Sequence, residues 1–152
     1  EKLFYLHSHS APMTYRIPPE EVLASAIRAV LSEYPMVTSQ RKLAKLVLRR
    51  LREEDELYTA SEERIRRVAI EQGAAKVEIH CRPGEERSRK GRCPVCGSRM
   101  KRIRNETIFG GSVTLGYRCD RCPYWTGLRK RIPARYIFYG DGYPQGGNSL
   151  ST

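Results

Sequence analysis

The chain has 152 residues, of which 39% are hydrophobic and 30% are charged, and its formal net charge is +11. This composition fits one compact domain or two small ones. No apolar run approaches the roughly 20 residues that a membrane-spanning helix needs, so the composition excludes a protein that crosses a bilayer through helices.

The beginning of the chain predicts an irregular or extended arm over residues 1–17, followed by a helix. The first residues, EKLFYLHSHSAPM, lack a basic segment followed by a sustained apolar stretch, so we do not expect a secretory signal. Pro18 and Pro19 suit the first turn of a helix, where a missing N–H costs least. Apolar residues then recur at helical spacing until Pro35, which predicts an amphipathic helix.

Two further amphipathic helices are predicted before residue 74. The second begins near Thr38 or Ser39, either of which can cap it, and its leucine and valine residues form one apolar face. The third follows the segment Thr59-Ala-Ser-Glu62, which has the spacing of a capping box, and Gly73 ends it. The outer face of this third helix mixes arginine with glutamate and is therefore not uniformly basic.

A half-buried strand is predicted over residues 75–81, because apolar and polar residues alternate strictly there. Cys81 lies on the apolar side of this strand, which favours a small buried residue over a metal ligand. Residues 83–92 are charged and carry Gly and Pro, so they predict a basic loop that serves either as a wing or as a linker.

Two C-x-x-C pairs, Cys93 with Cys96 and Cys119 with Cys122, predict a single metal site. A two-residue spacer lets one tight turn direct both thiolates to the same ion. The 22 residues between the pairs are enough for a β-hairpin that turns at Gly110-Gly111 and brings the second pair beside the first. Residues 124–138 can add a third strand, which completes a zinc ribbon over residues 93–139.

Four thiolates are typical of tetrahedral Zn²⁺, and iron in rubredoxin-like ligation is the alternative. A redox dithiol would need only one of the pairs. Because four thiolates leave no open coordination position for water, we expect one structural Zn²⁺ ion rather than a catalytic one. The sequence also has no phosphate-binding loop and no convincing set of catalytic residues, so we do not expect an enzyme.

The positive charge is concentrated around this predicted ribbon. Between Arg82 and Arg135 there are 15 lysine and arginine residues against 4 acidic residues, whereas the rest of the chain carries 13 of each sign. A segment this basic attracts polyanions, nucleic acid first, although a merely soluble basic surface is the alternative. The candidate nucleic-acid contacts are Arg64, Arg67, Arg87, Arg89, Lys90, Arg92, Lys101, Arg102, Arg104, Arg118, Arg121, Arg129, Lys130 and Arg131.

Aromatic residues are interleaved with these cations and have two possible roles. They are Tyr117, Tyr124, Trp125, Tyr136, Phe138 and Tyr139. Aromatic rings beside cations can stack on bases. We nevertheless expect at least half of them in the thin core of the ribbon, Tyr117 and Trp125 especially.

Three helices, a strand and a basic loop occur in the order found in winged helix-turn-helix domains, and SQRKLAKLV…YTASEERIRRVAIEQG resembles their second and third helices. A plain three-helix bundle with a β-extension is the alternative. The resemblance implies a winged-helix-like domain at 18–82. With the patterns above and the Gly- and Ser-rich end of the chain, the sequence predicts an α+β protein with an arm at 1–17, that domain, a basic loop or linker at 83–92, the zinc ribbon at 93–139 and a flexible tail at 140–152.

The whole chain resembles uncharacterised archaeal winged helix-turn-helix plus zinc-ribbon proteins, and its modules resemble those of the large subunit of transcription factor E. This resemblance implies a DNA-binding transcription regulator or factor in the cytoplasm, associated with the nucleoid or the ribosome. The arginine-rich ribbon also resembles the zinc-ribbon subunit of archaeal ribonuclease P, which implies an RNA-binding, ribosome- or ribonucleoprotein-associated protein. A protein–protein adaptor is the third hypothesis. We expect nucleic acid as the partner, DNA before RNA, with no membrane and with a homodimer possible.

Overall fold

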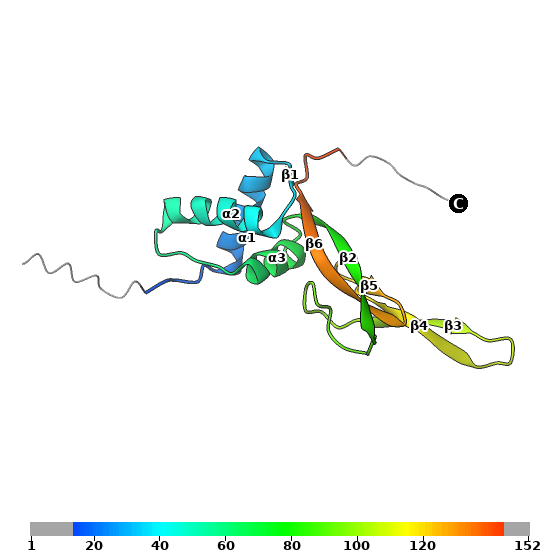
Figure 1. Cartoon of the computed structure of the whole chain (residues 1–152). Coiled ribbons are helices and arrows are strands. Elements are labelled where there is room, and N and C mark those ends of the chain that lie inside the picture. The colour runs from blue at the N-terminus through cyan, green and yellow to red at the C-terminus, as the bar shows by residue number, and fades with distance from the viewer. Residues whose placement is uncertain (1–13, 145–152) are drawn as a thin grey trace, which may run out of the picture.

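The computed structural model describes residues 14–144, in which three helices stand at one end and two small antiparallel sheets extend away from them (Figure 1). Most of the predicted arm and tail, at 1–13 and 145–152, lies outside the described residues. The α+β class is confirmed for the described part of the chain. None of its helices combines the length and the apolar character that crossing a bilayer requires.

The helices are α1 (Glu20–Glu33), α2 (Gln40–Glu54) and α3 (Glu62–Glu71). Pro19 stands at the cap position of α1, and the Ser39 side chain caps α2 by accepting a hydrogen bond of 3.0 Å from the backbone N–H of Lys42. The end of α3 is also as predicted, since Gly73 follows it with a φ of 61°.

The predicted capping box at the start of α3 is wrong by two residues. Ser61, not Thr59, caps the helix and accepts a hydrogen bond of 3.1 Å from the backbone N–H of Arg64. Thr59 still belongs to an extended segment, because its backbone N–H donates to the carbonyl oxygen of Arg16 at 2.9 Å.

The first sheet has the strand order β1-β6-β2 and joins segments that are far apart in the sequence. The strands are β1 (Met36–Val37), β2 (Lys76–Arg87) and β6 (Arg129–Tyr139). β2 and β6 pair antiparallel from Lys76 opposite Tyr139 to Arg87 opposite Arg129. This pairing corrects two expectations: residues 83–87 are strand rather than loop, and residues 129–139 do not extend the ribbon.

Phe138 explains why β6 belongs with the helices. Its register places it opposite Val37 of β1 and Val77 of β2, and its side chain is fully buried among the helices. Burying an aromatic ring of this size is strongly favourable, so the ring draws β6 onto the helical core.

The second sheet has the order β3-β4-β5 and is inserted between β2 and β6. Its strands are β3 (Lys101–Glu106), β4 (Ser112–Arg118) and β5 (Trp125–Thr126). The hairpin of β3 and β4 forms as predicted and projects away from the helices (Figure 1), but its turn spans residues 107–111 rather than Gly110-Gly111 alone. Of the predicted third strand of the ribbon, only Trp125–Thr126 joins this sheet, opposite Tyr117 and Arg118.

Candidate metal centre

The structure brings all four cysteines of the C-x-x-C pairs together in one buried cluster. Cys93 and Cys96 lie in the turn that precedes β3, whereas Cys119 and Cys122 lie in the turn between β4 and β5. All four are buried, and their sulfur atoms lie within 4.8 Å of one another. The β3–β4 hairpin is the element that returns the second pair to the first.

The spacing of the sulfur atoms fits four ligands around one ion. The Sγ atoms of Cys93 and Cys122 are 3.5 Å apart, and those of Cys96 and Cys119 are 3.4 Å apart. A disulfide would need about 2.05 Å. Four thiolates placed tetrahedrally around an ion at about 2.3 Å stand about 3.8 Å from one another, so the cluster could hold one metal ion.

The backbone of each turn is arranged to stabilise negative charge on sulfur. The N–H of Val95 points at Cys93 Sγ and the N–H of Arg121 points at Cys119 Sγ, both at 3.4 Å. Gly97 closes the first turn with a φ of 79°, a left-handed conformation that glycine adopts without a steric penalty. Its N–H donates to the carbonyl oxygen of Cys93 at 2.9 Å.

The pKa values of the thiols reflect how closely they are packed. The pKa of Cys93 is lowered to about 5, chiefly because the Cys122 thiol donates a hydrogen bond to it. The same contact raises the pKa of Cys122, and burial raises the pKa of Cys119. One thiolate is therefore stabilised by its protonated neighbours, whereas four thiolates in this volume require a cation to balance their charge.

A small apolar core surrounds the cluster and joins it to the rest of the protein. Val95, Met100, Tyr117 and Tyr124 are buried around the cysteines, and this core packs against side chains of α3, β2 and β6. Cys81 of β2 is one of those side chains. It is half-buried, burial raises its pKa, and it is not part of the metal-binding group found among residues 14–144.

Sequence reasoning missed the buried arginine that fastens this core to α3. The side chain of Arg66 donates from Nε to the carbonyl oxygen of Val95 at 2.7 Å and from Nη2 to that of Pro94 at 3.4 Å. Its guanidinium also donates to Gln40 and lies 4.7 Å from the centre of the Tyr136 ring. The neighbouring Ile65 faces inward, but nothing local in the sequence shows that Arg66 is buried.

The expectation for Trp125 is wrong, whereas Tyr117 is buried in the ribbon as expected, and Tyr124 is buried there as well. Trp125 is 50% exposed, because Thr126 takes the inward position of the two-residue strand β5. The Thr126 hydroxyl donates to the carbonyl oxygen of Arg129 and accepts from the N–H of Arg131. The guanidinium of Arg131 lies 3.9 Å from the centre of the Trp125 ring.

The candidate nucleic-acid contacts fall into two groups. The two on α3 are engaged within the protein: Arg64 is half-buried and donates to the carbonyl oxygen of Pro18, and Arg67 pairs with Glu63 at 2.7 Å. Those on the strands and turns around the metal centre are exposed, except for the half-buried Arg131. They are Arg87, Arg89, Lys90, Arg92, Lys101, Arg102, Arg104, Arg118, Arg121, Arg129 and Lys130.

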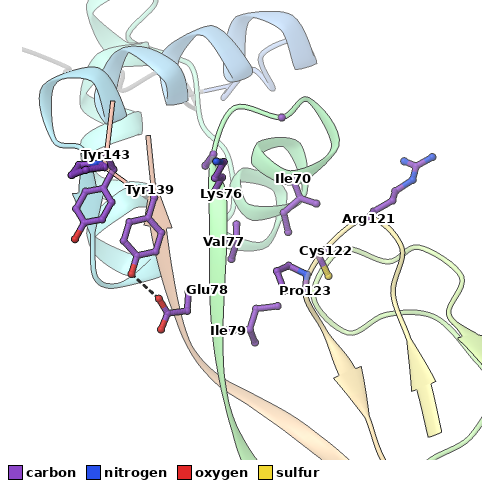
Figure 2. A pocket seen from close by; sticks show the side chains of 13 residues that line it. Ile70, Lys76, Val77, Glu78, Ile79, Arg121, Cys122, Pro123, Tyr139 and Tyr143 are labelled. Carbon is purple, nitrogen blue, oxygen red and sulfur yellow. Dashed lines mark hydrogen bonds between the residues drawn. The ribbon is translucent and has the colours of Figure 1, made fainter. Parts of the chain in front are cut away.

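A groove of about 780 Å³ runs between the second cysteine pair and the first sheet. Figure 2 shows Cys122 and Pro123 on one side of it and Ile79 of β2 on the other. At its far end Tyr139 donates a hydrogen bond of 2.6 Å to Glu78 (Figure 2). The groove lies where residues 121–123 of the inserted segment approach strands β2 and β6.

Comparisons of the chain with protein-family models, with curated proteins and with solved structures find no match. The features of the chain that bear on function are the four-cysteine cluster and the charged side chains around it.

Proposed function

We propose that this chain is a non-enzymatic, zinc-containing protein that binds nucleic acid, with duplex DNA as its partner. The exposed positive charge around the metal centre carries the proposal. Fourteen of the fifteen cations between Arg82 and Arg135 are exposed. Within residues 14–144 only one of the fifteen, Lys101, forms an ion pair, with Asp120 at 2.7 Å. Cations that the fold leaves unpaired are available to neutralise phosphates.

Zinc is the ion we assign to the four-cysteine cluster. A closed set of four thiolates suits tetrahedral Zn²⁺ and offers no position for a reacting water. The donors are Cys93, Cys96, Cys119 and Cys122, all buried. We therefore give the ion a structural role, in which it holds the β3–β4 hairpin at a defined angle to the helices.

We assign a winged-helix architecture to the three helices and the first sheet. Three helices followed by the antiparallel pair β2 and β6, with β1 as the third strand, support this assignment. In this description the ribbon is an extension of the wing. Because Arg66 is buried against Val95 and Arg67 is paired with Glu63, we assign nucleic-acid contact to the wing and the ribbon rather than to α3.

The test is the affinity of the zinc-loaded full chain for a duplex and for a structured RNA at several salt concentrations. We expect tighter binding to the duplex, with a logarithmic salt slope that reports the number of phosphates neutralised. Reversing Arg102 and Arg104 to glutamate should weaken binding at least tenfold and reduce the slope by about 2, since each lost phosphate contact contributes about 0.9.

The matched control reverses Arg49 and Arg50, two exposed cations at the end of α2, and should leave both affinity and slope nearly unchanged. Equal losses in the two pairs would contradict a binding face on the ribbon. A preference for RNA would select a ribonucleoprotein component instead. Failure to bind either polymer would leave the adaptor function.

A further inference from the structure

The tip of the β3–β4 hairpin carries two large apolar side chains that nothing in the described chain covers. Ile108 is 98% exposed and Phe109 is 97% exposed. A turn of this kind favours small and polar residues such as Gly, Asn, Asp and Ser. Exposed apolar side chains placed side by side at such a position indicate contact with a partner.

The turn itself does not need these side chains, because Thr107 closes it. The backbone N–H of Thr107 donates to the carbonyl oxygen of Gly111 at 2.7 Å, and the N–H of Gly110 donates to the carbonyl oxygen of Thr107 at 3.1 Å. The Thr107 hydroxyl accepts from the N–H of Gly111 and lies within hydrogen-bond distance of its carbonyl oxygen. Ile108 and Phe109 are thus held at the end of a closed turn.

The two strands behind the tip, β3 and β4, form the arm of the hairpin, and this hairpin arm is basic. Between Lys101 and Arg118 it carries four cations and a single carboxylate, Glu106. Arg102 and Arg104 lie opposite Tyr117 and Thr114 of β4, with a β-bulge in the pairing between Ile103 and Arg104, and both side chains are exposed.

The geometry points to insertion of Ile108 and Phe109 between base steps in the minor groove of duplex DNA, with the cations of the arm on the flanking phosphates. Proteins that bend DNA from the minor groove use apolar wedges of this kind, and Phe and Ile are among the residues that serve. This inference rests on the proposed function and adds the groove and the distortion of the duplex to it.

A duplex fits the charge of this surface better than a lipid surface does. Two side chains bury little apolar area, and stable attachment to a membrane requires more. The cations also continue past the arm along β6, at Arg129 and Lys130, as a linear polyanion would require.

The experiment uses the zinc-loaded full chain and a duplex with a central TA step, which is easily unstacked. The duplex carries 2-aminopurine beside that step and a dye at each end. Wild-type protein should raise the 2-aminopurine emission and shorten the distance between the dyes. Ile108→Ser with Phe109→Ser should bind roughly tenfold more weakly, with an unchanged salt slope and without either optical change.

The matched control is Val113→Thr with Leu115→Thr, which removes two apolar side chains from the same hairpin at positions that are 46% exposed. This control should bind and distort the duplex as the wild type does. The tip substitutions remove no contact within the described chain, so a folded protein is expected.

The outcomes separate the two claims. If the wild type binds the duplex with a steep salt slope but leaves the 2-aminopurine stacked, the wedge is overturned and the proposed function stands. If the wild type binds no duplex, both are overturned. Binding to phosphatidylserine vesicles that the tip substitutions abolish, without distortion of the duplex, would overturn the wedge in favour of a lipid surface.

Discussion

Arg66 of α3 donates a hydrogen bond of 2.7 Å to the carbonyl oxygen of Val95, a residue that lies between two of the proposed zinc ligands. The helices and the metal centre are therefore joined by a buried cation as well as by the chain. Because the guanidinium also meets Pro94 and Gln40, its removal would leave several polar atoms without partners.

We expect Arg66→Met to lower the free energy of unfolding by about 2–4 kcal/mol, since it leaves buried carbonyl oxygens unsatisfied. The control is Arg67→Met at the next position, which removes an exposed ion pair with Glu63 and a guanidinium that lies beside Gly97, and it should cost less than about 1 kcal/mol. Urea unfolding of the zinc-loaded proteins measures both changes. Similar costs for the two variants would show that Arg66 does not join α3 to the ribbon.

Substitution of any one of the four clustered cysteines by serine should lower the bound zinc well below one ion per chain. Cys93→Ser is the clearest case, because Cys93 is buried and the hydrogen bond from Cys122 lowers the pKa of its thiol. The same change at Cys81 should leave the zinc content unaltered, since Cys81 lies outside the cluster. Elemental analysis and the absorption spectrum of the cobalt-substituted protein provide the measurement. Zinc loss in Cys81→Ser would contradict the four-ligand assignment.

Phe138→Ala should destabilise the helices although it lies after the ribbon. Its ring is fully buried in the helical core, and truncating such a ring costs about 3–5 kcal/mol. Trp125→Ala, which removes a half-exposed ring over Arg131, should cost about 1 kcal/mol or less. Far-ultraviolet circular dichroism during thermal unfolding compares them. If the tryptophan change were the more costly one, β6 would not belong to the helical core.

The hydrogen bond between Tyr139 and Glu78 should make stability depend on alkaline pH. It raises the pKa of Tyr139 to about 12, against about 10 for an unperturbed tyrosine. Because the folded state holds this proton more tightly, the stabilisation is complete below about pH 10 and is lost as the pH rises toward 12. An ultraviolet absorbance titration of wild type minus Tyr139→Phe isolates this phenol. In Glu78→Gln its pKa should fall toward 10, and no change there would contradict the assigned cause.

The local elements could be predicted from the sequence because their signals are local. Helical spacing of apolar residues, the Ser39 cap and the stop at Gly73 defined the helices, and strict alternation defined the first part of β2. The C-x-x-C spacing places the two cysteines of each pair in one turn, and the hairpin predicted between the pairs brings all four to one site.

What the sequence did not show depends on contacts between distant residues. The pairing of β6 with β2 joins residues about fifty positions apart, and a run of residues that alternates in polarity does not name its partner strand. The two-residue strand β1 is too short to leave a pattern. The burial of Arg66 depends on the carbonyl oxygen of Val95, 29 positions away, which no periodicity of α3 encodes.

The insertion of the ribbon between β2 and β6 also has a consequence for the order in which the chain folds. Phe138 can reach the helical core only after the whole ribbon has been synthesised, so this part of the core is the last to be filled. Capture of an ion by Cys93 and Cys122 shortens the loop between the ends of β2 and β6 from about forty residues to about a dozen, and this lowers the entropy cost of closing it by about 1 kcal/mol. A metal ion bound by these cysteines would then favour the pairing of β6 with β2 and so the completion of the helical core.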